Sequence, residues 1–328
     1  MKNLFLLFVS AAMVIATFSS CEILDPGEPG LLVPLTVDED PSLPSISVNG
    51  TKLHAETYGN PNDPMIVVLH GGPGGDYRGM LKCSEFSGDG FYVVFYDQRG
   101  SGLSRRHPRE SYTSVQLFID DLDSVISHYR RRADQKVVLL GQSWGAMLAT
   151  AFVNEYPDRV SGVIMSEPGG FTWHDAKEYI RRCQELKPFD ETANDYVYLD
   201  QLVTGNDHIK LDYKAALQSA ATSAPGNKIG HPAPVPFWRF GAICNSACRN
   251  SAEEHPFDFT TDLHQYTKKV LFLYSELDVA YGKSYAEHVS SAYPNVQLVE
   301  VKGSGHEIPY FGWDKFYPLA KEYLNTIK

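Results

Sequence analysis

The feature that most constrains this chain is an apolar run that ends in a serine between two glycines. Val137–Leu140 is rich in Val and Leu, which is typical of a buried parallel strand, and it leads directly into Gly141-Gln142-Ser143-Trp144-Gly145. Met147–Tyr156 follows with helical composition. A Gly-x-Ser-x-Gly motif between a strand and a helix presents a nucleophilic serine at the top of a sheet. Small residues are needed at both glycines because neighbouring backbone passes close to them. We therefore predict that Ser143 is a nucleophile.

The composition is that of an ordinary, acidic globular protein. The chain has 328 residues, of which 43% are hydrophobic, and its formal net charge is -11 at pH 7. This length can bury one large core, or one core with a small appended domain. Arg130-Arg131-Arg132 closes a predicted helix, where cations suit the helix dipole. Because no longer basic stretch is present, we expect no nucleic-acid partner.

The N-terminal segment predicts export and attachment to a membrane. Lys2 precedes an apolar run from Leu4 to Phe18, and Ser19-Ser20-Cys21 follows. This order is typical of a secretory signal, and the run is short for a membrane span. It resembles a bacterial lipoprotein signal, which implies removal of residues 1–20 and lipidation of Cys21. A plain signal peptide cut nearby is the alternative. We expect the mature protein to be held at a bacterial membrane, in the periplasm or on the cell surface.

Two further features of the sequence are less specific, namely the segment after the signal and the four other cysteines. Residues 21–44 are rich in proline and acidic residues and are expected to form an extended tether, to which Leu31–Val37 could add an edge strand. Metal-ligand spacing of His and Cys is absent, so no zinc site is expected. An exported chain could form disulfides, and three pairings are open to the four remaining cysteines: Cys83, Cys183, Cys244 and Cys248.

Alternating strands and helices predict a mostly parallel α/β sheet with an antiparallel start. The start is a hairpin, Ser45–Val48 and Lys52–Tyr58, around Asn49-Gly50. Further strands are expected at Met65–Leu69, Tyr92–Tyr96, Val160–Met165, Val270–Tyr274 and Val296–Val301. Further helices are expected at Ser114–Arg131, Lys283–Ala292 and Trp313–Ile327.

The alternation stops between Gly170 and Thr261. Helical stretches are expected there at Ala176–Leu186, Ala193–Leu202 and Tyr213–Ala221, followed by irregular sequence that contains Pro and Trp. We therefore predict a core of residues 45–170 and 262–328. A mostly helical lid of residues 171–261 would be inserted after the sixth strand of the core.

A serine hydroxyl needs a base to take its proton. His306 fits best, because it follows the last strand in Gly303-Ser304-Gly305-His306 and precedes the final helix. The third member should orient the imidazole. Asp278, just past the seventh strand, is our choice, and Glu276 is the alternative. The chain order Ser143, Asp278, His306 is the one expected of α/β-hydrolases.

A tetrahedral oxyanion needs backbone donors. One should be the N–H of Trp144, the residue after the nucleophile. The other should come from the glycine-rich turn after the Met65–Leu69 strand, where Gly72 is our choice and Gly71 the alternative. No cofactor or metal is expected.

Three motifs together resemble the prolyl iminopeptidase family of α/β-hydrolases. They are His70-Gly71-Gly72-Pro73-Gly74, Asp97-Gln98-Arg99-Gly100-Ser101-Gly102-Leu103-Ser104 and Gly141-Gln142-Ser143-Trp144-Gly145, in the family's order and spacing. The resemblance covers roughly 46–168 and 270–328 and is weak across the lid. It implies a serine peptidase that removes an N-terminal residue, typically proline, with Ser143, Asp278 and His306 as the triad. Asp97 and Arg99 would be structural.

In that family, acidic residues near the lid hold the free ammonium of the substrate. An ammonium in a partly desolvated pocket needs a carboxylate partner. Glu167 ends the sixth strand at the expected catalytic edge, so we expect it to be one anchor. A capping or salt-bridging role at the strand end is the alternative. The lid motif that usually supplies the family's glutamates is not recognisable.

The leading hypothesis is an exported aminopeptidase that releases proline or a small apolar residue from peptides through an acyl-enzyme. An esterase, lactonase or amidase on the same scaffold is the second hypothesis. An inactive surface lipoprotein that only binds is the third. A dehalogenase or epoxide hydrolase is disfavoured, because these enzymes use a carboxylate nucleophile and Ser143 occupies that position. A small peptide and, through the lipid, a membrane are the expected partners.

Overall fold

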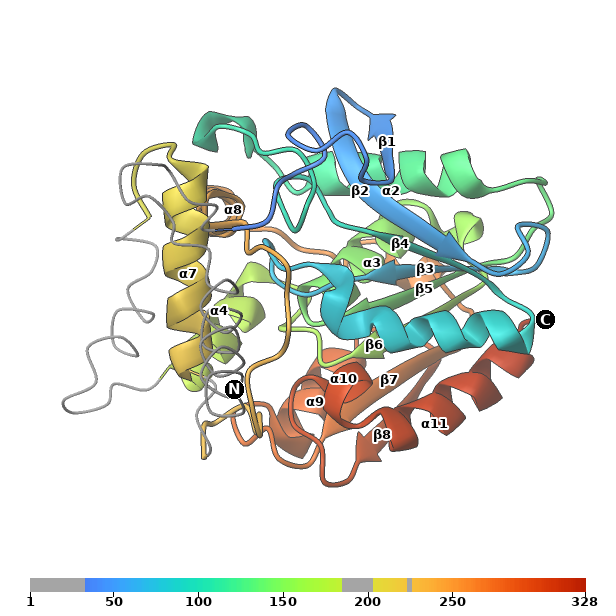
Figure 1. Cartoon of the computed structure of the whole chain (residues 1–328). Helices are drawn as coiled ribbons and strands as arrows, with labels where there is room; N and C mark the ends of the chain where they lie inside the picture. The colour runs from blue at the N-terminus through green and yellow to red at the C-terminus, as the bar shows by residue number, and fades with distance from the viewer. Residues whose placement is uncertain (1–32, 185–202, 223–225) are drawn as a thin grey trace, which may run out of the picture. The chain divides into compact units, whose positions relative to one another are not determined.

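An eight-stranded sheet organises the molecule (Figure 1). The computed structural model describes residues 33–184, 203–222 and 226–328. The strand order is β1-β2-β4-β3-β5-β6-β7-β8, and every neighbouring pair from β4 onward is parallel. The strands are β1 Ser45–Val48, β2 Thr51–Tyr58, β3 Met65–Leu69, β4 Tyr92–Tyr96, β5 Val137–Gln142, β6 Gly162–Ser166, β7 Val270–Ser275 and β8 Val296–Val301. The expected mostly parallel α/β sheet is confirmed.

The antiparallel start of the sheet is the hairpin that the sequence indicates. Strand β1 pairs with β2, and β2 pairs with β4. Asn49 and Gly50 both have positive φ, 43° and 74°, as a two-residue hairpin turn requires. The expected edge strand at Leu31–Val37 is wrong for its described part, because residues 33–37 form no strand. Val37 N donates to Leu103 O, and the side chains of Lys52 and Arg239 donate to Val37 O and Pro34 O.

The central parallel strands are buried along their whole length, which explains their continuous apolar sequence. Successive residues point to opposite faces. Val67 and Leu139 belong to the cluster under α2 (Gln116–Tyr129), α3 (Trp144–Glu155) and α9 (Gly282–Ser290). Their neighbours Ile66 and Val138 pack on the other face, under η1 (Tyr77–Asp89) and α11 (Trp313–Asn325). Helices therefore cover both faces, and the carboxyl edge of the sheet stays open for a site.

Helices follow β6 in the chain and lie over one end of the sheet (Figure 1). They are α4 (Trp173–Cys183), α7 (His208–Thr222) and α8 (Ala242–Glu254). The helix expected at Ala193–Leu202 lies outside the described residues. The expectation of irregular sequence is wrong for α8, whose alanines favour a helix and are buried against the core. The remaining short helices are η2 Arg109–Ser111, η3 Pro157–Arg159, η4 Leu263–Gln265 and α10 Ile308–Phe311.

The segment before α8 is tied to the glycine-rich turn after β3. Gly241 N donates to Gly74 O (2.7 Å). Asp76 Oδ2 accepts from the backbone N–H groups of Trp238 (2.6 Å) and Arg239 (3.1 Å). Asn245 Nδ2 donates to Pro73 O (2.7 Å). These bonds hold the helical region over the turn that the sequence places beside the nucleophile.

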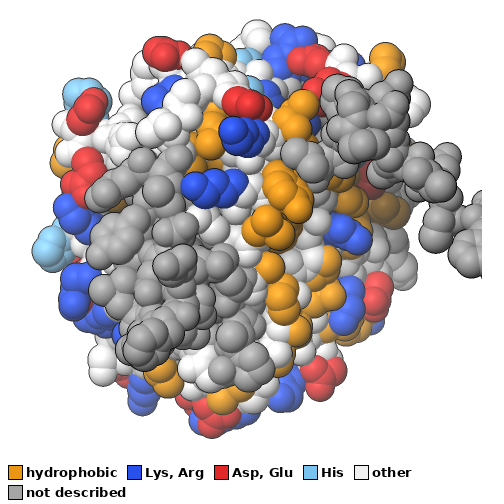
Figure 2. All heavy atoms as spheres, turned by 60° about the vertical axis from the view of Figure 1, so that its left-hand side comes forward, with side chains coloured by type: hydrophobic (Ala, Val, Ile, Leu, Met, Phe, Trp, Pro, Cys, Tyr) orange, Lys and Arg blue, Asp and Glu red, His pale blue; other side chains and the backbone are white. Residues whose placement is uncertain are grey.

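The surface that α7 presents carries exposed apolar residues. Figure 2 turns this side of the molecule forward and shows hydrophobic side chains gathered in a band. On α7 itself, Ile209, Tyr213 and Leu217 lie four residues apart and are exposed. In the described part of the chain, no helix is both long and apolar enough for a membrane crossing. The four described cysteines, for which disulfides were open, are free thiols.

Candidate active site

Ser143 sits in a strained turn between β5 and α3. Its backbone angles are φ 52° and ψ -119°, a conformation that residues with a side chain rarely adopt and that is often found at functional sites. The close approach expected at both glycines is confirmed. A Cβ on Gly145 would collide with the backbone of Leu69, and one on Gly141 would lie 2.5 Å from Ala146 N. These contacts keep the turn tight and the serine at the sheet edge.

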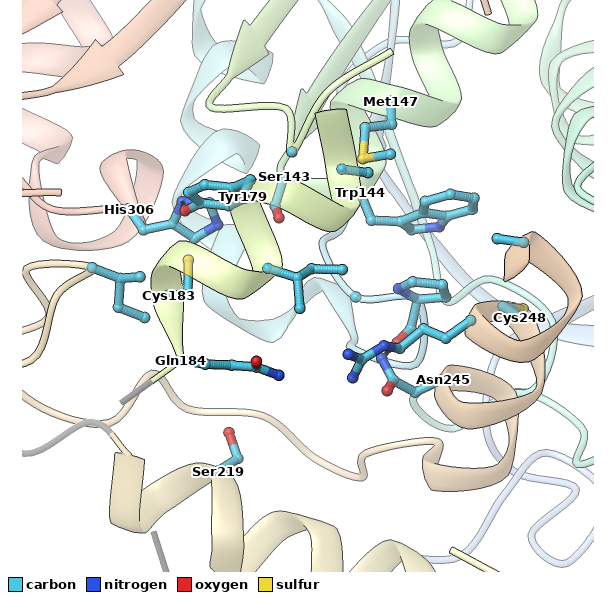
Figure 3. Close-up of a pocket in the computed structure, with 18 of the residues that line it drawn as sticks. Ser143, Trp144, Met147, Tyr179, Cys183, Gln184, Ser219, Asn245, Cys248 and His306 are labelled. Atoms are coloured by element: carbon cyan, nitrogen blue, oxygen red, sulfur yellow. Dashed lines mark hydrogen bonds between the residues drawn. The ribbon is translucent and has the colours of Figure 1, made fainter. Parts of the chain in front are cut away.

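The Ser143 side chain opens into a cavity of about 390 Å³, within the range of small-ligand pockets. His306 lines the same cavity, and Figure 3 shows both side chains pointing into it. Its walls are largely apolar and come from the core and from α4 and α8. Among them are Met147, Trp173, Ala176, Ile180, Ala252 and Phe257. The structure therefore brings the expected nucleophile and the expected base together beneath the helices inserted after β6.

Three buried side chains contact the same nitrogen, Nδ1, of the His306 imidazole. The residue lies in the loop after β8, and its backbone N–H donates to Ile229 O (2.9 Å). Nδ1 lies 2.9 Å from the Tyr179 hydroxyl, 3.0 Å from Glu167 Oε2 and 3.4 Å from Asp278 Oδ2. With Nδ1 on these buried groups, Nε2 is the nitrogen left to exchange a proton with Ser143.

Asp278, and not Glu276, lies at His306. The Asp278 side chain is fully buried. Its Oδ1 accepts from the N–H groups of Ala280 and Tyr281, both at 3.0 Å, and its Oδ2 accepts from the Tyr179 hydroxyl (2.7 Å). Glu276 instead is exposed, and it accepts from Gly303 N (2.8 Å) and pairs with a lysine at the surface.

Glu167 does not line the cavity, and its contacts match the alternative of a salt-bridging role at the strand end. Its side chain is fully buried. Oε1 accepts from the backbone N–H and the hydroxyl of Ser275, and Oε2 contacts His306. Its backbone φ is 43°. A substrate ammonium in the cavity would meet the imidazole before it reached this carboxylate.

Burial and neighbouring charges shift the pKa values of His306 and Glu167 in opposite directions. Burial alone would lower the pKa of His306, but the carboxylates of Asp278 and Glu167 outweigh it and raise that pKa above its ordinary value. Burial raises the pKa of Glu167, although the contact with His306 opposes the rise. The site therefore favours a positive imidazolium, which is the species that forms when the base takes the serine proton.

The two residues expected to supply the oxyanion donors, Gly72 and Trp144, line the same cavity as Ser143. Gly72 lines the cavity and has φ 134°, whereas the alternative, Gly71, does not line it. Trp144 begins α3, so its N–H is one of the helix-terminal donors without an intrahelical acceptor.

Gln98 connects the segments that carry these donors. It accepts from Trp144 Nε1 (2.8 Å) and donates its side-chain amide to His70 O (3.0 Å). Its backbone N–H donates to His70 Nε2 (2.9 Å), and burial lowers the pKa of His70, which favours the neutral, accepting ring. The network fixes the glycine-rich turn relative to the start of α3.

The contacts of Asp97 and Arg99 match the structural role that the resemblance implies. Asp97 accepts from the backbone N–H groups of Tyr77 (3.1 Å) and Leu103 (2.8 Å). Arg99 forms a two-pronged pair with Asp121, with both N···O distances at 2.6 Å. Both side chains are buried beneath the turns and outside the cavity lining.

Three residues of the site were not predicted from the sequence. Tyr179 reaches the triad from α4, and no local pattern marks a helical tyrosine for that role. Glu307 lines the cavity directly after His306, and its adjacency to the expected base was an available signal. His231 also lines the cavity, and its ring centroid lies 6.2 Å from that of His306. Burial lowers the pKa of His231 to about 3, so this second imidazole stays neutral.

Glu167, Asp278 and His306 are also the described group that best resembles a metal site, with one ligand atom from each within 4.8 Å of the others. The His306 atom on this side is Nδ1, and it already lies within hydrogen-bond distance of Glu167 and Tyr179. Hydrogen bonding with an imidazolium accounts for the arrangement.

The chain is similar to several known proteins. A family model described as serine aminopeptidase, S33, matches residues 60–193. Proline iminopeptidase PfmaB of Pestalotiopsis fici is 24% identical over 282 residues, which cover 80% of this chain and 92% of that protein. Proline iminopeptidase of Clostridium botulinum is 34% identical over 128 residues, 38% of this chain and 42% of that protein. A thermophilic esterase from Thermogutta terrifontis has a TM-score of 0.61 at 20% identity, over 87% of this chain and 97% of that one. The structural likeness shows a shared fold.

Proposed function

We propose that this chain, which has the α/β-hydrolase fold, is a serine hydrolase and, more narrowly, an aminopeptidase. It would release an N-terminal residue, proline or a small apolar residue, from short peptides. The relatives named as proline iminopeptidases support this activity. So does the cavity, whose volume of about 390 Å³ and largely apolar wall suit a small acyl group.

One observation carries the proposal. Ser143 occupies a positive-φ turn at the end of β5, and it shares a cavity with His306, whose Nδ1 lies against buried carboxylates. This arrangement is what a serine nucleophile needs, because the base must be oriented and its cation balanced.

The reaction follows the acyl-enzyme route. Ser143 Oγ attacks the carbonyl carbon of the first residue while its proton passes to His306 Nε2. The N–H groups of Gly72 and Trp144 stabilise the oxyanion. The tetrahedral intermediate expels the peptide amine, which takes the proton from Nε2 and leaves an ester on Ser143. Water then attacks that ester, gives a proton to Nε2, and releases the amino acid as the serine regains its proton.

An aminopeptidase also needs a group that holds the free amine. Glu307 supplies the one carboxylate among the described residues that line the cavity. Burial raises the pKa of its carboxyl, and a bound ammonium would favour the ionised form. Glu307 follows His306 in the chain, so it is close to the reacting centre, where the α-amine of a scissile first residue must lie. We assign the amine-holding role to Glu307 in place of Glu167.

An ester hydrolase is the second candidate, and the charge of the cavity wall favours it. Lys228 and Arg249 also line the cavity, and Lys228 Nζ donates to Gln184 O (3.2 Å). Two cations beside one carboxylate favour a neutral or anionic substrate over a cationic one. Such a substrate would be a short acyl ester, consistent with the esterase that shares the fold.

Matched substrates separate the two candidates. We expect prolyl and alanyl nitroanilides to be cleaved with a higher kcat/KM than their N-acetylated counterparts, and than butyrate and hexanoate esters. Preference for the simple esters would establish the second candidate. Ser143→Ala should lower every rate by more than about 10⁴-fold with an unchanged thermal midpoint. Near-normal turnover by this variant would remove Ser143 from the mechanism.

We further propose that the enzyme works outside the cytoplasm, tethered through Cys21 to a bacterial membrane. The support is the order of charged, apolar and small residues ahead of that cysteine. Residues 1–32 lie outside the described part of the chain. A short peptide substrate would then reach the cavity from the periplasm or the external medium.

A further inference from the structure

Two carboxylates converge on one ring nitrogen of His306, and a single one would be enough to orient it. Glu167 Oε2 lies 3.0 Å from Nδ1 and Asp278 Oδ2 lies 3.4 Å from it. They reach the ring from different strands, since Glu167 follows β6 and Asp278 follows β7. The carboxylate that the sequence favoured is therefore the more distant of the two.

Each carboxylate has one oxygen fixed and the other turned toward the imidazole. Glu167 Oε1 accepts two bonds from Ser275, which leaves Oε2 for the ring. Asp278 Oδ1 accepts two backbone bonds, which leaves Oδ2 for Tyr179 and the ring. Neither side chain is exposed. Both carboxylates are thus preorganised for the same task.

The backbone at Glu167 supports a functional reading of this contact. Asn49, Ser143 and Glu167 are the residues other than glycine with positive φ in the described part of the chain. Asn49 lies in a hairpin turn, where the conformation is expected. At Ser143 the conformation belongs to the tight turn that presents the nucleophile, and at Glu167 such strain persists because the surrounding structure enforces it. Glu167 N donates to Leu273 O (3.0 Å), which holds the residue across the sheet edge.

Tyr179 links the second carboxylate to the ring. Its hydroxyl donates to Asp278 Oδ2 (2.7 Å) and lies 2.9 Å from His306 Nδ1, so it can accept from the ring while it donates to the acid. Each of these two contacts is shorter than the 3.4 Å between Asp278 Oδ2 and Nδ1, so the hydrogen bonding from Asp278 to the imidazole runs through this hydroxyl. Glu167 needs no intermediary.

We propose that His306 is served by two acids, Glu167 in direct contact and Asp278 largely through Tyr179, and that either acid alone sustains catalysis. Both are positioning residues that act through the imidazole and do not touch the substrate. They keep the Nδ1 proton in place while Nε2 exchanges a proton with Ser143. This inference rests on the proposed role of Ser143 and His306, and it applies to peptide and ester substrates alike.

The pH dependence of the reaction reports this arrangement. With both carboxylates present, the raised pKa of His306 should place the acid limb of the activity profile above the range of an ordinary histidine. Removing one carboxylate should move that limb to lower pH. The other titratable groups around the three side chains are Tyr179 and Cys183 of α4, Tyr281 before α9, His231, and Glu307 beside the ring.

The test compares Glu167→Gln, Asp278→Asn and the double variant in the protein that starts after Cys21. The readouts are the rate of fluorophosphonate labelling and the hydrolysis of a butyrate ester, each from pH 5 to 10. We expect each single variant to lose no more than about 100-fold, and the double variant to approach the roughly 10⁴-fold loss known for a triad without its acid. The acid limb should shift downward in both singles.

Glu276→Gln is the matched control, because it removes an exposed carboxylate at the end of β7 without touching His306. The Glu276→Gln variant should leave the reaction rates and the pH profile unchanged. A roughly 10⁴-fold loss in Asp278→Asn alone would overturn the proposal, as would a Glu167→Gln profile that matches wild type. Should Glu167→Gln fail to fold, Asp278→Asn and the milder Ser275→Ala still decide it. Ser275→Ala removes the hydroxyl donor to Glu167 Oε1, leaves the backbone donor in place, and should shift the acid limb. Labelling that persists in Ser143→Ala would instead refute the nucleophile, a separate outcome.

Discussion

At the scale of single residues, the distribution of carboxylates separates the roles around His306. Glu167 and Asp278 lie behind the ring and away from the cavity, whereas Glu307 lines it. The sequence indicated Glu167 as a residue that holds the amine, because it ends a strand at the correct edge. A residue at the end of a strand can point its side chain toward the cavity or beneath it. The backbone conformation decides which of the two occurs.

The assignment of Glu307 predicts a selective loss. Glu307→Gln should lower kcat/KM for aminoacyl nitroanilides by about 10- to 100-fold, because a charge-assisted hydrogen bond is worth about 1.5–3 kcal/mol. Rates with short acyl esters, which have no amine, should change little.

The comparison uses one pair of substrates, alanyl ester and propionyl ester, which differ only in the amine. Glu254→Gln, at the exposed end of α8, serves as the control for loss of a surface carboxylate. An equal loss on both esters would show that Glu307 supports the site and does not hold the amine.

At the scale of elements, the region after β6 is fastened to the core at buried polar groups. Asp76 caps η1 through Arg78 N (3.0 Å) and also accepts from two backbone N–H groups ahead of α8. Burial, and then the charge of Asp97, raise its pKa to about 7. One carboxyl therefore joins the turn after β3 to the segment that leads into α8.

The raised pKa of Asp76 predicts a loss of stability with rising pH. Between about pH 4 and pH 7, the folded protein holds a proton on Asp76 that the unfolded chain has released. The contribution of Asp76 to the free energy of unfolding is therefore full below the unfolded pKa and falls as pH rises through about 7, by about 1.4 kcal/mol per unit of raised pKa.

Asp76→Asn cannot ionise, so its free energy of unfolding should change less than that of wild type over this range. Urea unfolding at pH 4.5 and at pH 7.5 measures the difference. Asp134→Asn, at a side chain that is 82% exposed, is the control and should follow wild type. Parallel pH dependence of wild type and Asp76→Asn would show that Asp76 is ionised throughout the range.

At the scale of the whole molecule, the core was predictable because its signals are local. The strands β3, β4 and β8 begin and end where the apolar runs do, and the glycine contacts around Ser143 follow from the motif. The region after β6 was less predictable, since α8 gains its stability from burial against the core and not from a strong amphipathic pattern. The contact of Tyr179 with the acid depends on how α4 docks, which no local pattern encodes.

The proposed tether predicts a defined chemical modification. The full chain expressed in a bacterium that processes lipoproteins should incorporate a labelled fatty acid and fractionate with membranes, and Cys21→Ser should lose the label. Cys183→Ser, at a partly buried thiol, is the matched control and should keep it. A wild-type protein without label, cut near residue 20 and recovered in solution, would instead indicate a plain signal peptide.

Helix α4 forms part of the cavity wall, and through the Tyr179 hydroxyl it also contacts Asp278 and His306. If α4 swung away to admit a peptide, the bond to Asp278 would break and the imidazole would lose one of its supports. Entry by that route would then leave the ring oriented mainly by Glu167, and proton abstraction would be slowed. Premature transfer to water would be suppressed until the helix returned, and a direct bond from Glu167 would keep the ring from rotating out of place during the interval.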